Sequence, residues 1–272
     1  MKPYFEKENI KLYQCDNLEL LKELPDNYIK VIYIDPPFSV GRDFKTKDGQ
    51  FAFSDKYTLE ELIDYLRPRI EQIYRVLRED GSFYIHGDNN YIHNLKVECD
   101  KIFGFNNYKG DIIWYRYNKI PDKTKKLFFK MHDTILHYTK SDTYTFNAIV
   151  ENTGEIIKRK KMKKNNGKIT TINEYIEYEK QILLTRSVIE NIPDICIGNS
   201  KEITGYPTQK PVKLIERLII ASSNENDIIA DFFMGSCSTG EASLKLNRKF
   251  IGCDIGDIAC KISKERLIKI LK

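Results

Sequence analysis

Motifs for metal ions and disulfides are absent from this sequence. Its six cysteines are scattered, with no Cys-x-x-Cys pair and no cluster of cysteine and histidine at zinc-ligand spacing. We therefore expect no metal site, and scattered thiols are typical of a reducing compartment. Also missing are an apolar signal-peptide core near the start and any apolar run of the roughly 20 residues that cross a membrane. These absences predict a cytoplasmic location and no membrane partner.

The length and charge of the chain leave its function open. Its 272 residues allow one large domain, or a core domain with a smaller insertion. The hydrophobic fraction of 41% and the charged fraction of 31% are ordinary for a globular protein, so we do not expect extensive disorder. A net charge of +5 fits an acidic partner such as nucleic acid but does not require one.

Strand-like and helix-like segments alternate through most of the chain. Residues 31–34 form a continuous β-prone run, typical of a strand buried on both faces. Residues 62–77 place apolar side chains at helical spacing after a capping box of Thr58 and Glu61. The alternation predicts an α/β fold, a mostly parallel sheet with helices on both faces. The expected strands are residues 11–14, 31–34, 82–86, 111–117, 134–138, 228–230 and 250–253, and the expected helices are residues 17–24, 58–78, 91–103, 212–222, 241–246 and 258–271.

One region breaks the alternation. Residues 139–203 have poor periodicity and many polar side chains, including a basic run over 158–168. We expect a small inserted domain here, between residues 1–138 and 204–272 of the main domain. The stretch 38–57, with two glycines and several charges, is expected to be a loop.

Acidic residues follow four of the expected strands. They are Asp16, Asp35, Asp231 and Asp254. Ligands of parallel α/β sheets bind beyond the carboxyl ends of the strands. We therefore expect these four carboxylates to lie around one site.

The tetrapeptide Asp35-Pro36-Pro37-Phe38 directly follows a buried strand. Prolines stiffen the backbone and have no N–H to offer to a sheet. Asp35 and the Pro36 carbonyl can accept hydrogen bonds from both hydrogens of an amino group, which would aim its nitrogen lone pair at an electrophile. Phe38 offers a face on which an extruded base can stack. A strand ended by a turn, with Phe38 in the core, is the alternative for the tetrapeptide alone.

A loop of small residues lies between the expected strand 228–230 and the helix that follows. It runs over residues 231–240 (Asp-Phe-Phe-Met-Gly-Ser-Cys-Ser-Thr-Gly), and such a loop lets a nucleotide-like ligand approach the backbone at a helix N-terminus. Asp254 ends the next strand, at the position of an acid that binds ribose hydroxyls in such units. The glycines are too few for a dinucleotide G-x-G-x-x-G motif.

Together these segments resemble those of the β-class amino-DNA methyltransferases, a group with many restriction-modification enzymes. Residues 35–38 match that family's catalytic motif in its adenine-N6 form, and residues 231–240 resemble its S-adenosylmethionine loop. Residues 205–211 resemble the motif upstream of that loop, and residues 14–16 the segment that contacts the cofactor's adenine. The order, with the catalytic motif first, an insert next and the cofactor loop last, is the permuted order of the β class. The resemblance implies a seven-stranded, Rossmann-like methyltransferase sheet and methylation of adenine N6 in DNA after base flipping.

The resemblance also implies a set of cofactor-binding residues. In it, Asp254 would hold the ribose, Asp16 would face the adenine, and Thr208 and Lys210 would support the amino-acid end. The whole implied set is Cys15, Asp16, Asp35, Thr208, Lys210, Asp231, Phe233, Gly235, Ser236, Cys237, Ser238, Thr239 and Asp254.

Catalysis and DNA contact are implied for other residues. The resemblance makes Asp35, Pro36, Pro37 and Phe38 the catalytic set and the insert the target-recognition region. The cations that we expect to contact DNA are Lys119, Lys123, Lys158, Arg159, Lys160 and Lys161. Double-stranded DNA is the expected partner, with a homodimer and a cognate restriction endonuclease as further expectations.

Two positions depart from the family pattern. Cys237 stands where the cofactor loop has its second glycine, so its side chain could crowd the cofactor if glycine's dihedral angles are required. Ser39 stands where many relatives have asparagine. Two alternatives remain: cytosine-N4 methylation, for which Ser is more common than Asp at position 35, and a catalytically weakened DNA-binding relative, which only Cys237 suggests. Enzymes that methylate a protein glutamine usually begin the motif with Asn and have the unpermuted order, and this chain has neither feature.

Overall fold

The computed structural model describes residues 1–118, 126, 128–165, 168–195 and 202–271, so Lys119 and Lys123 lie outside it. The chain divides into two compact units, one of Met1–Asn147 with Ser187–Lys272 and one of Ala148–Arg186. The second unit is narrower than the predicted insert of residues 139–203. The residues flanking it belong to the first unit because they bond to its sheet and helices: Asn147 donates from its backbone to the carbonyl of Ala221 at 2.7 Å.

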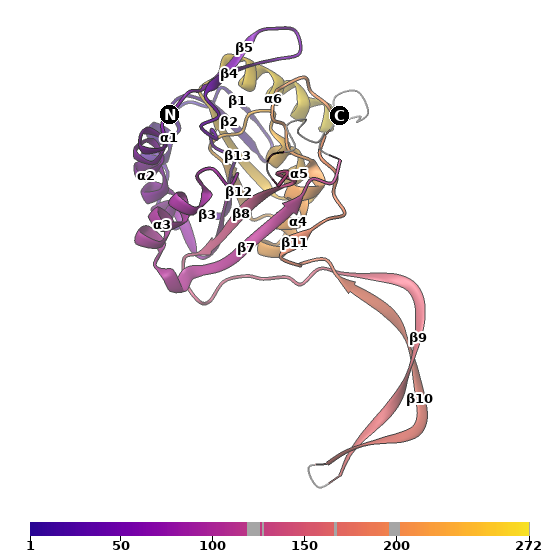
Figure 1. Cartoon of the computed structure of the whole chain (residues 1–272). Helices are drawn as coiled ribbons and strands as arrows, with labels where there is room; N and C mark the ends of the chain where they lie inside the picture. The colour runs from indigo at the N-terminus through magenta and orange to yellow at the C-terminus, as the bar shows by residue number, and fades with distance from the viewer. Residues whose placement is uncertain (119–125, 127, 166–167, 196–201, 272) are drawn as a thin grey trace. The chain divides into compact units, whose positions relative to one another are not determined.

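A sheet of nine strands, counted over the described residues, forms the centre of the first unit (Figure 1). Five neighbouring strands, β2, β13, β12, β3 and β6, are parallel, whereas β8 runs antiparallel to both of its neighbours. The seven predicted strands are all present, and two short edge strands, β1 and β11, were not predicted. In spatial order the strands are β1 (Phe5–Lys7), β2 (Ile10–Gln14), β13 (Lys249–Asp254), β12 (Ile228–Asp231), β3 (Ile29–Ile34), β6 (Leu77–Gly87), β8 (His132–Thr139), β7 (Tyr108–Tyr115) and β11 (Val188–Ile189).

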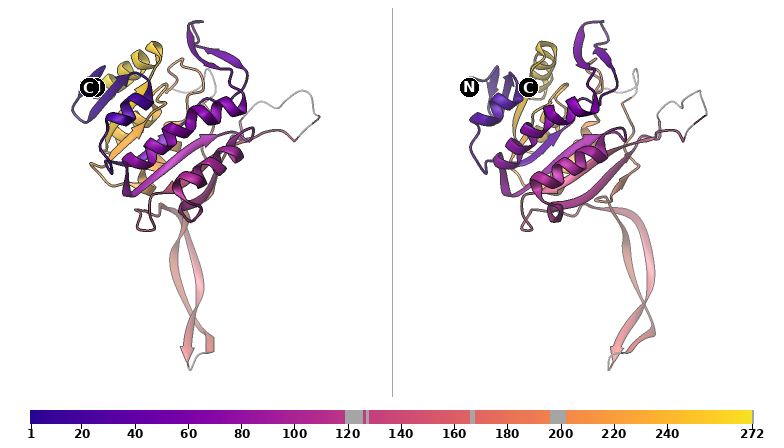
Figure 2. Two further views of the ribbon diagram at one scale, coloured as in Figure 1. Left: turned by 90° about the vertical axis from the view of Figure 1, so that its left-hand side faces the viewer. Right: turned by 60° about the vertical axis from the view of Figure 1, so that its left-hand side comes forward.

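Helices cover both faces of this sheet, which confirms the predicted α/β architecture (Figure 2). One face carries α1 (Asn17–Glu23), α2 (Leu59–Val76) and α3 (Ile92–Phe103), followed by the short 3-10 turn η1 (Phe105–Asn107), and the other carries α4 (Val212–Ser222), α5 (Ser238–Lys245) and α6 (Asp257–Ile270). Side chains of a strand point alternately to its two faces. In β3, accordingly, Ile32 packs in the core under α1–α3, whereas Val31 packs in the core under α4.

The two ends of helix α2 can be explained from the sequence and from strand pairing. Thr58 caps its start, with the capping box to Glu61 that the sequence predicted. The helix ends at Val76, earlier than predicted, because β6 begins at Leu77 and pairs with β3 there.

The predicted loop 38–57 contains a hairpin of β4 (Arg42–Lys45) and β5 (Phe51–Asp55). Phe44 and Phe53 stack across it with ring centroids 4.8 Å apart. Ala52 also packs against Tyr206 and Ala259. The loop expectation was wrong because these packing partners lie about 150 to 200 residues further along the chain.

The second unit is a single long hairpin of β9 (Val150–Asn165) and β10 (Lys168–Leu183). Most of the described side chains on it are exposed. Among the described residues of the whole chain, no helix combines the length and apolar character needed to cross a membrane.

Candidate active site

A cavity of about 670 Å³ lies where β3, β12 and β13 end. This volume lies within the usual range of roughly 300–1,000 Å³ for small-ligand sites. The structure thus brings most of the predicted catalytic and cofactor residues together. Those that line the cavity are Asp35, Pro36, Pro37, Phe38, Thr208, Lys210, Asp231, Phe233, Gly235, Ser236, Ser238, Thr239 and Asp254. Cys15, Asp16 and Cys237 do not line it.

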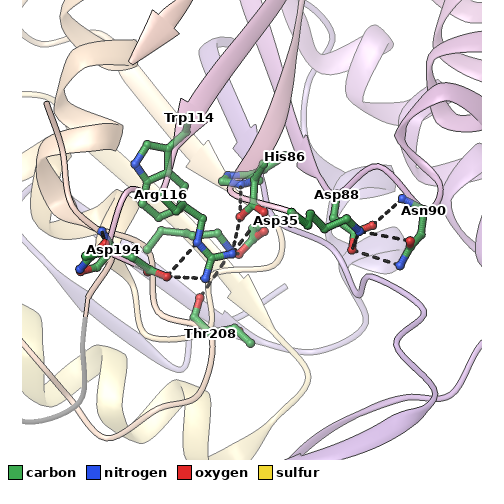
Figure 3. A network of polar contacts seen from close by, with 12 residues as sticks. Asp35, His86, Asp88, Asn90, Trp114, Arg116, Asp194 and Thr208 are labelled. Atoms are coloured by element: carbon green, nitrogen blue, oxygen red, sulfur yellow. Dashed lines mark hydrogen bonds and ion pairs between the residues drawn. The ribbon is translucent and has the colours of Figure 1, made fainter. Parts of the chain in front are cut away.

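The Asp35 carboxylate is held on one side only (Figure 3). Its Oδ2 accepts a hydrogen bond from Lys210 Nζ at 2.5 Å, and this nitrogen is 3.5 Å from the Thr208 carbonyl oxygen. Its Oδ1 is buried and has no hydrogen-bond partner among the described residues. Buried acceptors in proteins almost always have a donor. Oδ1 is therefore available to a donor from a bound molecule.

Near Asp35 lies a network of buried and part-buried polar groups (Figure 3). His86 contacts the Tyr33 hydroxyl through Nδ1 at 2.8 Å and Asp133 through Nε2 at 3.3 Å. Arg116 donates to Asp133 at 3.1 Å and to Asp194 at 2.8 Å. Burial opposes ionisation of Asp133, but its bond to His86 and the charges of Lys210 and Arg116 hold its pKa well below the ordinary value. These hydrogen bonds therefore hold the Tyr33 side chain in place, and Tyr33 lines the cavity.

Phe38 is packed at the rim of this network. Its ring centroid lies 5.7 Å from that of Tyr91 and 6.1 Å from that of His86. Lys210 Nζ lies 5.1 Å from the same centroid. Phe38 is half-buried and lines the cavity, so part of its ring remains available to a ligand.

Two further carboxylates, Asp231 and Asp254, line the cavity. Asp231 accepts hydrogen bonds from the Phe233 amide at 3.0 Å and from the Thr239 hydroxyl at 2.6 Å. Asp254 accepts from the amides of Gly235 and Gly256, both at 2.9 Å. Burial raises the pKa of Asp254, although these amides lower it.

The loop between β12 and α5 approaches the cavity closely because Gly235 has no side chain. Its φ is +46°, in the left-handed region. A β-carbon there would lie 3.1 Å from the Tyr206 ring. The loop thus leaves a backbone cradle beside two carboxylates, which fits a cationic, ribose-containing cofactor such as S-adenosylmethionine.

We expect Asp231 to make stability depend on pH. Burial raises its pKa from the ordinary 3.8 to about 7, although the Thr239 and Phe233 donors lower it. The neutral carboxyl thus stabilises the fold fully below the unfolded-state pKa, and this contribution is lost as the pH rises through about 7. The difference between the two pKa values corresponds to roughly 4 kcal/mol.

Urea unfolding of the wild type and Asp231→Asn at about pH 5 and about pH 8 tests this. Asparagine cannot ionise, so only the wild type should lose the additional stability at the higher pH. An equal change in both proteins would contradict the prediction.

The structure turns the Cys237 side chain away from the cavity. Its backbone adopts the left-handed conformation that glycine has more easily, with φ +63° and ψ +38°. The side chain is fully buried against Leu12 and Phe250, and a β-carbon added at Gly240 would collide with its sulfur. The thiol therefore fills the core beneath the loop.

Cys237→Gly should consequently leave cofactor affinity almost unchanged. We expect the Kd for S-adenosylmethionine, measured by calorimetry, to stay within about twofold of the wild type, which is well under 1.4 kcal/mol. A tenfold gain in affinity would show instead that this side chain weakens the cofactor site.

Asp16 and Cys15 have structural partners outside the cavity. Asp16 caps α1 through the Leu18 amide at 2.7 Å and accepts two hydrogen bonds from Arg69 at 2.8 and 2.9 Å. Cys15 Sγ lies 3.5 Å from Cys253 Sγ. Asp16 thus does not line the cavity, and its predicted contact with the cofactor stays a prediction.

Sequence reasoning missed several aromatic residues of the cavity wall. Tyr65 belongs to the apolar stripe of α2, yet it lines the cavity, and the guanidinium carbon of Arg69 is 3.6 Å from its ring centroid. The aromatic content of the expected loop 38–57 was the other available signal. The additional aromatic lining residues are Tyr33, Phe44, Phe51, Phe53, Tyr57, Tyr65 and Tyr206.

The predicted DNA-contacting cations of the insert lie on β9. Lys158 pairs with Glu177 at 2.5 Å and Lys161 with Glu174 at 2.9 Å. Arg159 and Lys160 instead lie over the rings of Tyr178 and Tyr175, at 5.5 and 5.8 Å from their centroids.

Comparison with known proteins assigns this site to a family. A family model described as DNA methylase, of the N6/N4 methyltransferase type, matches residues 29–265. The DNA adenine methyltransferase YhdJ of Escherichia coli (strain K12) is 30% identical, and the alignment covers 98% of this chain and 90% of that protein. The Type II methyltransferase M.HpaI of Haemophilus parainfluenzae is 32% identical, with 93% and 73% covered.

Solved structures agree in fold. The PvuII DNA methyltransferase, named cytosine-N4-specific, superposes with a TM-score of 0.69 at 18% identity, covering 97% of this chain and 88% of that one. The complex of M1.HpyAVI with SAM gives 0.62 at 22% identity, covering 95% and 98%. Since the family model and both sequence relatives span most of the chain, it belongs to the N6/N4 family of DNA methylases, whose cofactor is S-adenosylmethionine.

Proposed function

We propose that this chain transfers the methyl group of S-adenosylmethionine to N6 of adenine in double-stranded DNA, after flipping the base out of the helix. The observation that carries the proposal is the unpartnered Oδ1 of Asp35 at the cavity, followed by two prolines and the ring of Phe38. Relatives support adenine as the target, since YhdJ is named a DNA adenine methyltransferase.

In this proposal, the residues of the chain act by positioning the target amino group and the base that carries it. Asp35 Oδ1 accepts one N–H of the target amino group and the Pro36 carbonyl accepts the other, which orients the nitrogen lone pair into the cavity. Phe38 supplies the face on which the base stacks. The cofactor, when bound, supplies an activated methyl group. Lys210 keeps the other oxygen of Asp35 occupied, so the amino group meets Oδ1.

The cofactor would lie along the opposite wall. Asp254 lines the cavity between the amides of Gly235 and Gly256, and it would hold the ribose hydroxyls. Asp231 would add negative charge near the sulfonium when it is ionised, above a pKa of about 7. Phe233 and Tyr65 would supply apolar faces. These are assignments to be tested residue by residue.

Cytosine N4 is the second candidate, because its amino group needs the same two acceptors and the PvuII enzyme of similar fold is named cytosine-N4-specific. Two DNA samples separate the candidates: one in which N6-methyladenine replaces every adenine, and one in which N4-methylcytosine replaces every cytosine. With tritium-labelled cofactor, we expect labelling of the cytosine-replaced DNA and none of the adenine-replaced DNA. The reverse pattern would overturn the adenine assignment.

DNA contact by the hairpin of β9 and β10 is part of the proposal. Arg159 and Lys160 combine cations with tyrosine faces, a combination that suits phosphates and bases. An isolated two-stranded hairpin is marginally stable in water, so a bound partner would stabilise it. Replacing both cations by glutamine should flatten the dependence of DNA affinity on salt, whereas an unchanged slope would exclude these contacts.

We also propose the partners and location that the sequence suggested. Relatives named Type II methyltransferases support a cognate restriction endonuclease. The five cysteines of the described residues are all free, which supports a reducing cytoplasm. A homodimer is testable by light scattering during size-exclusion chromatography.

A further inference from the structure

The backbone that follows the two prolines turns around one buried carboxylate, that of Asp55 at the end of β5. Its oxygens accept hydrogen bonds from three consecutive amides, those of Phe38 at 3.1 Å, Ser39 at 2.6 Å and Val40 at 3.3 Å. Asp55 is 1% exposed. Successive amides directed at one anion form a nest, a backbone arrangement that holds negative charge.

Other bonds close the same loop onto β5. The Gly41 amide donates to the Asp55 carbonyl oxygen at 2.8 Å, and the Ser39 hydroxyl donates to the carbonyl oxygen of Tyr57. Ser39 has a φ of +56°, which side chains other than glycine adopt at a cost. The surrounding bonds must therefore impose this conformation, and the Asp55 carboxylate supplies most of them.

The loop so fixed carries the ring that faces the target base. Phe38 is both an amide donor to Asp55 and the ring packed against Tyr91 and His86. Without the carboxylate, three part-buried amides would lose their acceptor, at a cost of roughly 1–3 kcal/mol for each amide left unsatisfied. The loop would then relax, and Phe38 with it.

Asp55 also belongs to the wall of the cavity. Ala52, Phe53 and Ser54 of the same strand line the cavity, and Ala52 packs against Tyr206. One side chain therefore joins the wall of the cavity to the catalytic loop. Burial raises the pKa of Asp55, whereas the three amides lower it. The hydrogen bonds from the amides thus offset part of the cost of burying this carboxylate.

We propose that Asp55 is a positioning residue for methyl transfer: its carboxylate fixes the Phe38 backbone and so the surface on which the flipped base stacks. The inference rests on the proposed function. Asp55 touches neither reacting atom, so its loss slows the transfer step and leaves cofactor binding in place.

Asp55→Asn tests this with little change of shape, since one oxygen becomes an NH2 group that faces an amide donor. A misplacement of about 1 Å at a catalytic group can cost about 100-fold in rate. We expect kcat per S-adenosylmethionine-binding site to fall about 10- to 100-fold, with the cofactor Kd within about threefold of wild type. Asp55→Glu, which keeps the charge, should give an intermediate kcat. If the Asn variant binds no cofactor, the kcat of Asp55→Glu is compared with that of the wild type instead.

Asp43→Asn is the matched control. Asp43 lies on the same hairpin, is exposed, and pairs with Lys56 at 2.6 Å rather than with the catalytic loop. Its kcat should equal that of the wild type. A kcat for Asp55→Asn within about twofold of wild type, or a loss confined to cofactor Kd, would overturn the inference. Absence of N6-methyladenine from the wild-type product would instead reject the proposed function.

Discussion

We expect Asp35→Ala to lower methyl transfer at least about 100-fold while cofactor affinity changes little; this is the largest effect that the site predicts. The replacement removes a buried acceptor, Asp35 Oδ1, that has no hydrogen-bond partner among the described residues and is available to the target amino group. Loss of a single pre-positioned hydrogen-bonding group at a reacting centre costs about 100- to 1,000-fold in rate. Single-turnover transfer to DNA and calorimetry with S-adenosylmethionine measure the two quantities separately.

Asp64→Ala provides the control for that variant. Asp64 is an exposed aspartate on α2 that pairs with Arg67 at 2.8 Å and does not line the cavity. Its transfer rate should match the wild type. Full activity of Asp35→Ala would remove the basis of the proposed mechanism, and a loss of cofactor binding to match the loss of rate would move Asp35 into the cofactor site.

Lys210→Met gives the second-largest expected effect, on stability as well as rate. Lys210 and Asp35 form an ion pair with side chains 10% and 17% exposed. Breaking a buried pair from one side leaves an uncompensated charge and typically costs about 3–5 kcal/mol. The rate of transfer should fall too, because Asp35 loses the contact that turns Oδ1 toward the cavity.

A double replacement separates these two roles. Asp35→Asn combined with Lys210→Met removes both charges, so its free energy of unfolding should exceed that of Lys210→Met alone. Its transfer rate should not recover, because Asp35 is missing. Additive losses of stability in urea unfolding would show that the two side chains do not interact as the structure indicates.

The sequence was sufficient to locate the strand ends that carry chemistry. Asp35, Asp231 and Asp254 each follow a short apolar run, and parallel strands bring their carboxyl ends to one edge. The cavity follows from that rule. The periodicity of the sequence does not show which side chains bond to one another. Lys210 and Asp35, for example, form an ion pair although they are 175 residues apart along the chain.

The features that the sequence does not predict also depend on contacts between residues that are distant along the chain. The bond between Asp16 and Arg69, 53 residues later, is one such contact. The role of Asp55 cannot be predicted from the sequence, because its donors are backbone amides and no side-chain motif indicates them. Along β9, the acids that neutralise Lys158 and Lys161 come from the returning strand, and only the register of the hairpin shows the pairing.

The identity of the methylated base in the product tests the assignment to adenine N6 most directly. Purified protein is incubated with S-adenosylmethionine and unmethylated DNA of mixed sequence, and the DNA is digested to nucleosides for mass spectrometry. We expect N6-methyladenine from the wild type and at least about 100-fold less from Asp35→Ala. N4-methylcytosine, or N6-methyladenine formed equally by both proteins, would contradict this expectation.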